Sequence, residues 1–469
     1  MKVLLINPPS GREILCNNPR IVKEEVGCFP PLGLLYLGTI LKNRGYLVSV
    51  LDAQVEKLTY QEIGKFIREY KPDVTGIIVM TFTLLDVLDT CRLVKKEAPS
   101  SRLVLGGPHV YIYPREAMYT TGADYAIMGE GEFSFPMLLE NLDNFKELPR
   151  IPGLVYREGS DIRFGADPEF IEDLDSIPIP DRTLTPFRKY SSLLSINNPV
   201  TTMFTSRGCP YRCSFCDRPH LGKRFRAHSA GYVISEMEAC ERLGIKEILV
   251  YDDTFTIDRK RVIDVCMGYL ERGLTIVWSI RSRVNTVDCE MLSFLKRANC
   301  QHIHFGVEAG TSKILHVLNK DITKEQALKA FRTSKQLGIE TLAYFMIGAP
   351  SETEQDIRAT FRFARQLAPD FMHLTILTPF PGTEIYRMGI ERGLFPDFYQ
   401  AFAADPRDSF TPRFWDAEIR ESRLKELVLE GYKKFYFRPS YILSRLLRLK
   451  NARELWKKAR AALKLFLWK

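Results

Sequence analysis

Apolar residues in the first 145 positions alternate between short continuous runs and stretches with helical spacing. The continuous runs predict five strands, at 2–7, 47–51, 74–80, 102–105 and 124–128. The stretches between them predict helices at 32–44, 60–70, 86–97 and 114–121. Near-continuous apolar strands separated by helices predict a parallel, doubly wound α/β sheet. Such sheets bind ligands beyond the carboxyl ends of their strands.

The residues that follow these strands are candidates for ligand contact. Glycine lets a ligand approach the backbone closely, and hydroxyl groups can bond a polar rim. The same residue types also make the turns that any such fold requires, so both interpretations stay open. The candidates are Pro8, Thr81, Phe82, Thr83, Gly106, Gly107, Pro108, Gly129 and Glu130.

A second alternation of strands and helices begins near residue 196. Before it, residues 146–195 combine spaced prolines with an acidic run, which predicts an extended linker. The second alternation predicts six βα units and hence a partial barrel with its chemistry at the carboxyl ends of the strands. Its predicted strands are 200–206, 245–251, 275–281, 302–308, 340–347 and 371–378. Its predicted helices are 229–243, 258–272, 288–298, 323–337 and 353–367. The predicted domains are therefore 1–145, 196–400 and a helical extension at 401–469.

Three closely spaced cysteines follow the first strand of the predicted barrel. Cys209, Cys213 and Cys216 have the spacing C-x3-C-x2-C, whereas the other seven cysteines are scattered. Three thiolates can hold a cubic [4Fe-4S] cluster, which has four irons and normally takes four protein ligands, so one iron would stay open. One alternative is a structural zinc site completed by His220 or His228. Another is that the three cysteines are buried thiols that bind no metal.

The stretch Arg207-Gly-Cys-Pro-Tyr-Arg-Cys-Ser-Phe-Cys-Asp217 resembles the cluster motif of the radical SAM superfamily. The resemblance implies that the amino and carboxylate groups of S-adenosylmethionine chelate the open iron. It also implies that an electron from the reduced cluster cleaves the sulfonium and yields a 5′-deoxyadenosyl radical. Cys209, Cys213 and Cys216 would be both the metal ligands and the catalytic centre.

Four charged residues at the ends of the second and third barrel strands are expected to hold S-adenosylmethionine. Asp252 and Asp253 stand where the family contacts the methionyl amino group, although the pair could instead shape the turn before a helix capped by Asp258. Arg281 and Arg283 share one face of a strand, and one of them could clamp the methionyl carboxylate. Either arginine could equally form a surface ion pair.

The next two barrel strands end in further candidates. Glu308 is placed to bond the ribose hydroxyls of the nucleoside, and Gly348 resembles the strand glycine that packs beside adenine. His302 and His304 alternate on the fourth strand without an apparent acidic or thiol partner. We expect core or barrel-lining positions for both histidines rather than metal ligation.

The N-terminal region resembles the cobalamin-binding domain that precedes the radical SAM domain in one branch of that superfamily. Gly106 and Gly107 match the paired glycines beside the nucleotide tail of the cofactor, and Thr81 and Thr83 fall at a Ser-x-Leu element. The Asp-x-His-x-x-Gly loop that ligates cobalt in other cobalamin proteins is absent, since residues 11–29 contain no histidine. His109 is the single histidine of residues 1–145, and we expect it to have a structural or hydrogen-bonding role.

The net charge of +9 is concentrated at the C-terminus. From residue 431 onward the chain has twelve lysines and arginines and a single acid, Glu454, while the rest is close to charge balance. No basic stripe in the body supports a nucleic-acid partner. Predicted helices at 440–450 and from Asn451 onward combine leucines with Trp456 and Trp468, which is typical of a segment in a membrane interface or of a helix docked on its own domain.

No apolar window is long enough to cross a membrane, and the N-terminal apolar run is too short for a signal peptide, so we expect a cytoplasmic enzyme. The resemblance implies three cofactors: a [4Fe-4S] cluster, S-adenosylmethionine and cobalamin. It implies an external electron donor such as flavodoxin or ferredoxin. The expected reaction is radical C-methylation of a hydrophobic or lipid substrate. Oxidative ring closure on a tetrapyrrole, as in the anaerobic magnesium-protoporphyrin monomethyl ester cyclase, is the alternative, and a non-catalytic zinc and cobalamin sensor is a remote one.

Overall fold

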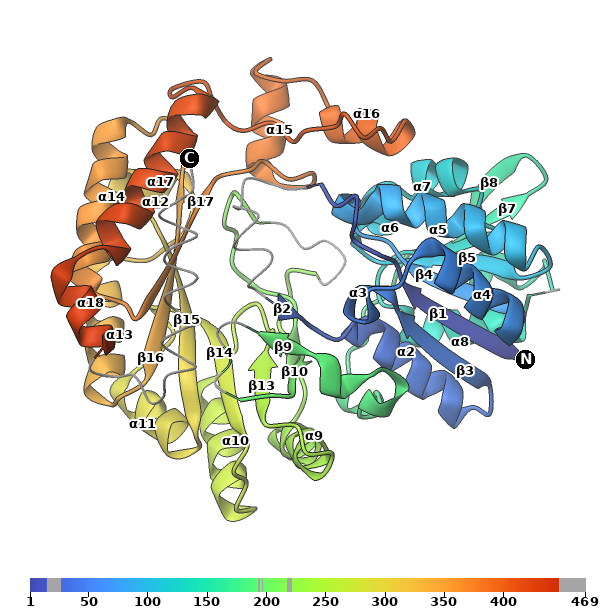
Figure 1. Ribbon diagram of the computed structural model, residues 1–469, viewed down its shortest axis with the longest axis horizontal. Helices are drawn as coiled ribbons and strands as arrows, with labels where there is room; N and C mark the ends of the chain where they lie inside the picture. The colour runs from blue at the N-terminus through green and yellow to red at the C-terminus, as the bar shows by residue number, and fades with distance from the viewer. Residues whose placement is uncertain (15–26, 143, 193–194, 196, 217–221, 447–469) are drawn as a thin grey trace.

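Two α/β units lie side by side in the computed structural model (Figure 1). The structure describes residues 1–14, 27–142, 144–192, 195, 197–216 and 222–446. The first unit is built on a seven-stranded sheet and the second on a six-stranded sheet. Each sheet has its own buried apolar core, so each unit satisfies the basic requirement for a domain.

The first sheet has the strand order β3-β1-β4-β5-β6-β7-β8. Its five parallel strands are those predicted from the sequence: β1 (Lys2–Asn7), β3 (Leu47–Asp52), β4 (Val74–Ile78), β5 (Arg102–Gly106) and β6 (Tyr125–Ile127). One face is covered by α2 (Leu32–Asn43) and α8 (Gly131–Glu140), and the other by α4 (Tyr60–Tyr70), α5 (Leu84–Glu97) and α7 (Pro114–Thr121). The chain reverses its direction across the sheet between β1 and β4, which is where doubly wound sheets bind ligands.

The predicted linker 146–195 is partly wrong, because two of its segments extend the first sheet. β7 (Leu154–Glu158) and β8 (Asp161–Phe164) form an antiparallel hairpin, and β7 pairs with β6. Gly159 makes the turn with a φ of 63°, and Val155 and Ile162 are buried. The alternating pattern on both sides of a glycine was the hairpin signal, and it is short enough to be hidden among prolines and acids.

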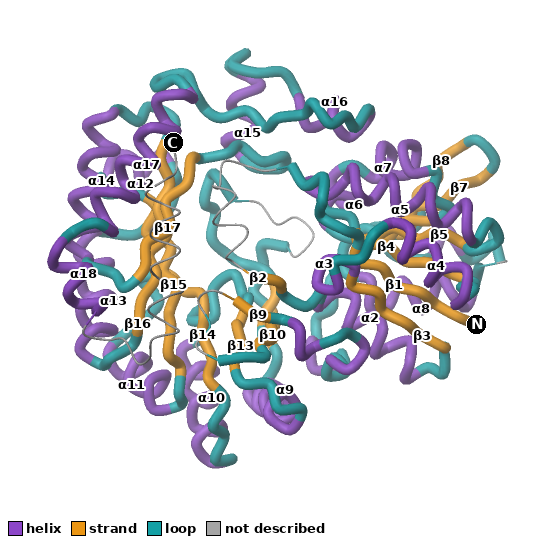
Figure 2. The backbone as a smooth tube through the Cα atoms, in the orientation of Figure 1, coloured by secondary structure: helices purple, strands orange, loops and turns teal. Residues whose placement is uncertain are grey.

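The second sheet runs in sequence order, β10-β13-β14-β15-β16-β17, with every neighbouring pair parallel. Figure 2 shows its strands standing as an open, curved wall with the helices outside it. This is the predicted partial barrel. Its strands are β10 (Val200–Met203), β13 (Glu247–Val250), β14 (Val277–Arg283), β15 (Cys300–Glu308), β16 (Glu340–Ile347) and β17 (Phe371–Ile376).

The five predicted barrel helices form within one or two residues of their predicted bounds. Each begins after a side chain that accepts a hydrogen bond from a backbone N–H of the first turn, which explains why it starts there. These capping residues are Ser229, Asp258, Asp288, Thr323 and Thr353. The helices are α9 (Ala230–Arg242), α10 (Arg259–Glu271), α11 (Cys289–Arg297), α13 (Lys324–Gln336) and α14 (Glu354–Leu367), with a shorter α12 at Ser312–Val317.

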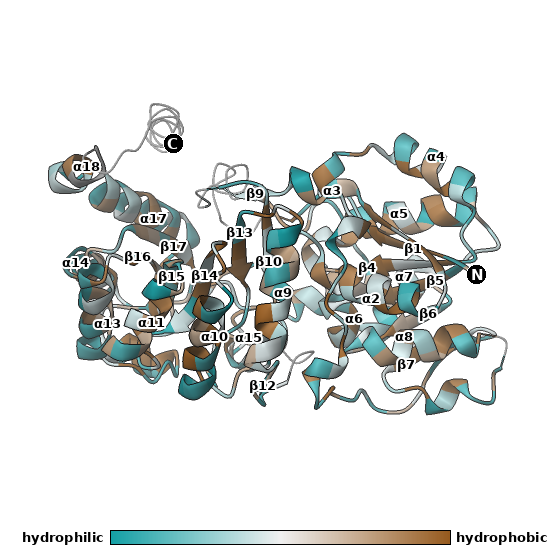
Figure 3. Cartoon of the chain, turned by 90° about the horizontal axis from the view of Figure 1, so that it is seen from below, coloured by the Kyte–Doolittle hydropathy of each residue, from teal (hydrophilic) through white to brown (hydrophobic). Residues whose placement is uncertain are grey.

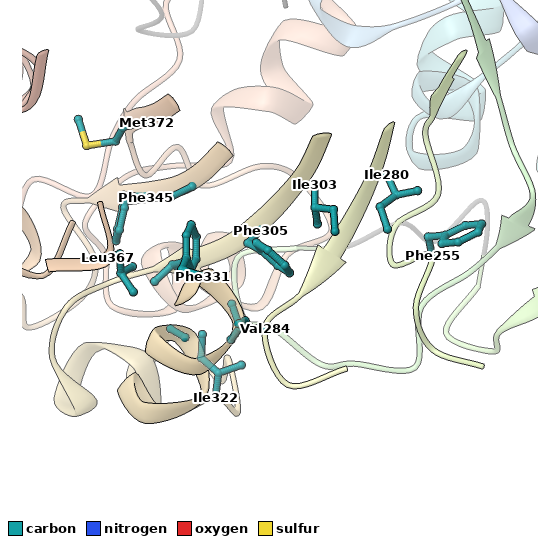
Figure 4. Close-up of a cluster of buried hydrophobic side chains, with 14 of the residues drawn as sticks. Phe255, Ile280, Val284, Ile303, Phe305, Ile322, Phe331, Phe345, Leu367 and Met372 are labelled. Atoms are coloured by element: carbon teal, nitrogen blue, oxygen red, sulfur yellow. The ribbon is translucent and has the colours of Figure 1, made fainter. Parts of the chain in front are cut away.

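The barrel core lies between the sheet and these helices. Figure 4 shows Ile280, Ile303, Phe305 and Phe345 pointing from the strands into this layer. Figure 3 shows the same contrast by hydropathy, with apolar strands and polar outer surfaces on the helices. Since strand side chains alternate between faces, the residues between these apolar positions must face the concave side of the sheet.

The C-terminal extension covers the last barrel strand and contacts the first domain. Tyr432 and Tyr436 of α17 (Glu421–Tyr436) accept hydrogen bonds from the backbone N–H groups of Leu374 and Met372, at 3.1 and 2.9 Å, which protects the edge of β17. The helices α15 (Glu384–Glu391) and α16 (Phe398–Ala404) precede it, and Gln400 donates a 2.6 Å hydrogen bond to Glu116 on α7.

A final helix, α18 (Pro439–Leu446), begins one residue before the predicted start at Ser440. The predicted helix from Asn451 onward lies outside the described residues. Within the described part of the chain, no helix has both the length and the hydropathy needed to cross a membrane.

Candidate active site

The cysteine loop leaves β11 (Ser206–Arg207) at the end of the first barrel strand and is anchored by the segment after α12. Ser214 donates its backbone N–H to the Leu318 carbonyl and its hydroxyl to the Val317 carbonyl, both at 3.0 Å. The Asn319 amide donates to the Arg212 carbonyl at 2.7 Å. Cys209, Cys213 and Cys216 all retain solvent exposure. The loop is thus fixed at one end of the barrel with its three thiols accessible.

Arg283 serves this loop. Its Nη1 lies 3.4 Å from the Cys213 sulfur, its guanidinium stacks 3.8 Å from the Tyr211 ring centre, and its Nη2 donates to the carbonyls of Lys320 and Asp321. These contacts occupy much of the guanidinium, and they hold Arg283 against the cysteine loop. Arg281, two residues earlier on the same strand face, stacks 3.9 Å from the Tyr251 ring centre instead.

The zinc alternative lacks its fourth ligand among the described residues. His228 is buried, its Nδ1 lies 3.1 Å from Asp175, and burial lowers its pKa to about 4 despite that partner. His220 lies outside the described residues. Across the described ranges, no three His, Cys, Asp or Glu side chains are grouped closely enough to hold a single metal ion. Three thiols around a bulkier cubic cluster need no such close approach, so the donor set fits an iron–sulfur cluster.

The two aspartates after β13 have different surroundings. Asp252 is fully buried, and its carboxylate accepts hydrogen bonds from the backbone N–H and hydroxyl groups of both Thr205 and Ser206, at 2.6 to 3.1 Å. These bonds occupy the carboxylate, so the predicted contact of Asp252 with the methionyl amino group stays a prediction. Its four bonds fix the chain just before the cysteine loop. Burial raises the pKa of the Cys209 thiol, and the negative charge of Asp253 adds to this effect.

Glu308 has a buried cation as its partner, which the sequence reasoning missed. Lys320 Nζ lies 2.7 Å from the Glu308 carboxylate, and both side chains are almost fully buried. Glu308 has a φ of 68°, and the pairing of β15 with β16 shifts register between Gly306 and Glu308. A bulge and a left-handed non-glycine residue at the end of a strand commonly mark a functional site. The one sequence signal for Lys320 is its position as a lysine shortly after a helix with apolar residues.

Gly348 stands at the end of β16 with a φ of 83°. A Cβ there would lie 3.1 Å from Leu424 of α17, so this side of the glycine faces the C-terminal extension. The backbone N–H groups of Gly348 and Ala349 donate to Glu352 Oε2 at 2.6 and 2.9 Å. Burial raises the pKa of Glu352 to about 7 against the effect of these two bonds. The sequence reasoning did not single out Glu352.

The carboxyl edge of the first sheet carries the two candidate glycines. Gly107 has a φ of 109°, and a Cβ there would lie 2.8 Å from the Val79 carbonyl oxygen, so the close approach of two strands requires this glycine. A Cβ on Gly106 would meet no atom of the described residues within 4 Å. Thr81 Oγ1 lies 3.0 Å from Nδ1 of the buried His109, whose Nε2 has no hydrogen-bond partner among the described residues. A glycine without described neighbours and, three residues later, an imidazole with an unsatisfied nitrogen fit a polar cofactor group.

The other candidates at this edge are mostly structural. Pro8 and Thr83 are buried, and the Thr83 hydroxyl bonds to the Met80 carbonyl. Phe82 packs edge-to-face against Phe380 of the barrel domain at 5.5 Å, so it joins the domains. Pro108 begins a short helix directly after Gly107, and Gly129 lies near Pro168, both partly exposed.

Glu130, a predicted cofactor contact, is part of a buried ionic cluster between the domains. Arg226 of β12 (Arg226–Ala227) donates to both of its carboxylate oxygens at 2.8 Å, and Arg207 of β11 lies at 3.3 Å. Arg207 also donates to Glu132 at 2.5 Å. The two arginines are paired residues of one ribbon, and the cysteine loop emerges from it. The ionic cluster therefore fixes the cysteine loop against the carboxyl edge of the first sheet.

Family models match the two domains in the order in which they occur. The radical SAM superfamily model matches residues 203–364, and the B12 binding domain model matches residues 21–139. An uncharacterized methyltransferase of Pyrococcus horikoshii is 34% identical over 94% of this chain and 94% of its own length. The anaerobic magnesium-protoporphyrin IX monomethyl ester cyclase of Cereibacter sphaeroides is 28% identical over 88% of this chain and 68% of its own length.

The chain belongs to the cobalamin-binding radical SAM enzymes. Its cofactors are therefore a [4Fe-4S] cluster, S-adenosylmethionine and cobalamin, as the resemblance implied. The fold of this radical SAM enzyme matches that of the methyltransferase TsrM from Kitasatospora setae with cobalamin and a [4Fe-4S] cluster bound. The TM-score is 0.71 at 20% identity, over 83% of this chain and 78% of that one.

Proposed function

We propose that this enzyme transfers a methyl group to an unactivated carbon of a small organic molecule. The observation that carries the proposal is the position of the cysteine loop, which starts at Arg207 and is tied through Glu130 and Glu132 to the carboxyl edge of the cobalamin-binding domain. The two cofactor sites are thereby held in one fixed arrangement. When bound, the cluster supplies the electron that cleaves S-adenosylmethionine, and cobalamin supplies a methyl carrier for carbons that a sulfonium methyl cannot attack directly.

The residues around the loop have separate tasks in this proposal. Cys209, Cys213 and Cys216 ligate the cluster. Asp253, whose charge acts on Cys209, faces the methionyl ammonium, while Glu308, held by Lys320, binds the ribose hydroxyls. Gly348, fixed through Glu352, flanks the adenine. At the other cofactor site, Thr81, Gly106 and Gly107 line the cobalamin tail.

The test is anaerobic incubation of the loaded enzyme with reductant and a flavodoxin or ferredoxin as electron donor. The substrate source is a cell extract, and the methyl donor is S-adenosylmethionine carrying a deuterated methyl group. Methyl transfer is expected to yield 5′-deoxyadenosine, S-adenosylhomocysteine and a product heavier by one labelled methyl group. Absence of both nucleoside products from the reaction would refute the proposal. Cys213→Ala should abolish both products, whereas Cys289→Ala, which removes an exposed thiol on α11, should not.

Oxidative ring closure is the second candidate, because the cyclase of Cereibacter sphaeroides matches most of this chain. The two reactions differ in their products. A cyclase forms 5′-deoxyadenosine and a substrate that has lost hydrogen, without S-adenosylhomocysteine and without the labelled methyl group. A hydrophobic body in the substrate, as in a lipid or a tetrapyrrole, is part of the proposal in both cases.

Peripheral contact with an anionic membrane is the accompanying proposal for the C-terminal extension. Phe437, Ile442 and Leu443 are exposed large apolar residues in and beside α18, and the chain beyond them is strongly basic. Sedimentation with phosphatidylserine vesicles, but not with phosphatidylcholine vesicles, is expected, and Leu443→Asp should weaken it. Equal sedimentation with both lipids, or none with either, would contradict membrane contact.

A further inference from the structure

A row of polar and aromatic side chains crosses the concave face of the barrel sheet. Its members are Tyr251 at the end of β13, Arg281 on β14, His304 on β15, Tyr344 on β16 and His373 on β17. Arg281 is the register partner of His304, and Tyr344 is the register partner of His373. Their sequence neighbours, such as Ile280, Ile303 and Phe345, point into the apolar core, so the row itself faces the barrel interior (Figure 4).

The row is held together by direct contacts. His304 Nδ1 lies 3.1 Å from the Tyr344 hydroxyl, and the Tyr344 and His373 rings meet edge-to-face at 5.5 Å. The Arg281 guanidinium lies over the Tyr251 ring at 3.9 Å. All five side chains are half-buried, so each is packed by protein and still reached by solvent. These contacts preorganise the row.

The charge of the row is unbalanced. Among the described residues, no carboxylate lies within ion-pairing distance of Arg281, although the structure pairs most of its other buried cations. Two acids at the neighbouring strand ends have other partners, since Glu308 pairs with Lys320 and Asp252 accepts four hydrogen bonds. A half-buried guanidinium without a counter-ion favours an anion.

The two histidines supply neutral hydrogen-bonding groups beside this cation. Burial and the positive charge of Arg281 lower the pKa of His304 to about 3, and burial lowers the pKa of His373. Both imidazoles are therefore neutral at neutral pH. In the tautomer whose Nδ1 accepts from the Tyr344 hydroxyl, the ring hydrogen is on Nε2 and can be donated to an acceptor.

The row lies deeper in the barrel than the cysteine loop. Arg281 and Arg283 are two residues apart on one strand, which corresponds to about 7 Å along β14. Arg283 contacts Cys213, so Arg281 lies about 7 Å along the strand from the residue that touches the cysteine loop. A substrate bound at the row would extend from there toward the nucleoside on the cluster.

We propose that Tyr251, Arg281, His304, Tyr344 and His373 bind an acidic group, a carboxylate or a phosphate, of the organic substrate. Arg281 provides the charge and a planar pair of donors, and the neighbouring imidazole and phenol groups complete the hydrogen bonds. The rest of the molecule lies toward the cluster. This inference rests on the proposed function, since it names the substrate class of the same active site.

The experiment fractionates the cell extract by anion exchange at pH 7 into an anionic pool and a neutral and cationic pool. Each pool is incubated anaerobically with the loaded enzyme and S-adenosylmethionine carrying a deuterated methyl group. The labelled product is expected from the anionic pool. Treatment of that pool with alkaline phosphatase before incubation removes the substrate when its acidic group is a phosphate monoester and leaves it when the group is a carboxylate.

Three variants test the assignment to Arg281. Arg281→Gln should lower labelled product at least tenfold and raise the ratio of 5′-deoxyadenosine to product, because the radical would form without a positioned substrate. Arg281→Lys keeps the charge and should lose less product than Arg281→Gln. Arg102→Gln, an exposed arginine on the first domain, is the matched control and should equal wild type.

The failures of the two proposals are distinguishable. Labelled product from the neutral and cationic pool, or undiminished product from Arg281→Gln, would overturn the anion site and leave methyl transfer intact. A parallel loss of 5′-deoxyadenosine and product in Arg281→Gln would assign Arg281 to S-adenosylmethionine and also overturn the anion site. No labelled product from either pool with wild-type enzyme would refute the proposed function itself.

Discussion

Removing the Glu130 carboxylate should loosen the junction between the two domains. In Glu130→Ala, Arg226 loses two hydrogen bonds of 2.8 Å and Arg207 loses an ion pair, although Arg207 keeps Glu132. All of these side chains are less than a tenth exposed. Breaking one partner of a buried ion pair costs about 3–5 kcal/mol, because the remaining charge stays buried. That loss corresponds to roughly 10 °C in the melting temperature of a domain of this size.

The assay is thermal unfolding of the apoprotein followed by circular dichroism, with Glu172→Gln as the matched control. Glu172 also pairs with an arginine, Arg224, at 2.7 Å, but both side chains are more than half exposed. Such a pair contributes at most about 1 kcal/mol. A melting temperature for Glu130→Ala within a few degrees of that for Glu172→Gln would refute the reasoning. The loaded Glu130→Ala enzyme should also form less 5′-deoxyadenosine.

The acid side of the stability curve gives an independent check. Burial raises the pKa of Glu130, but Arg226 and Arg207 outweigh it and hold the pKa below the ordinary value of 4.5. A carboxyl with a lowered folded-state pKa contributes stability above its unfolded pKa and loses it as the pH falls through the folded value. The difference between wild type and Glu130→Ala should therefore be full at pH 7 and shrink below pH 4.5.

Three further substitutions test the site. Gly106→Ala should change the free energy of unfolding by less than about 1 kcal/mol, since a Cβ there meets no described atom within 4 Å. It should nevertheless reduce the cobalamin retained after desalting at least tenfold, and full retention would contradict the cofactor assignment. The raised pKa of Glu352 means that its carboxyl stays protonated in the folded state between pH 4.5 and about 7. The free energy of unfolding of the wild type, measured in urea, should therefore fall by up to about 3 kcal/mol as the pH rises through that range. Glu352→Gln should flatten this pH dependence. Parallel stability curves for the variant and the wild type would show that Glu352 is not its source. Lys320→Met leaves the Glu308 carboxylate buried without a cation and should lower 5′-deoxyadenosine formation at least tenfold, unlike Lys313→Met at a half-exposed pair.

Most of the architecture was predictable because it depends on local patterns. Continuous apolar runs and helical spacing identified the parallel strands of both sheets, and side chains such as Asp258 and Thr323 marked where helices begin. The hairpin β7–β8 was missed because its alternation spans few residues on either side of Gly159. Short antiparallel edge strands carry less periodic signal than buried parallel ones.

Individual site residues were less predictable, because a carboxylate or guanidinium at a strand end can face several partners. Asp252 and Glu130 both stand where a ligand contact was expected, yet one caps the chain before the cysteine loop and the other bridges two arginines. Lys320 and Glu352 went unnoticed because their partners are set by loops that cross between strands. Only the packed structure determines which carboxylate pairs with which lysine or arginine.

The sequence by itself determined the cysteine loop and the order of the two domains, since metal-ligand spacing and strand periodicity are properties of short segments. The cofactors followed from the family resemblance that these segments carry. The tertiary structure alone decided how the two domains are joined through Glu130 and which arginine supports the cysteine loop. It also decided which arginine has no counter-ion among the described residues. Arg281 and Arg283 are indistinguishable in the sequence. They differ because residues far along the chain, Cys213 and Lys320 on one side and His304 and Tyr344 on the other, are brought beside them only when the barrel forms.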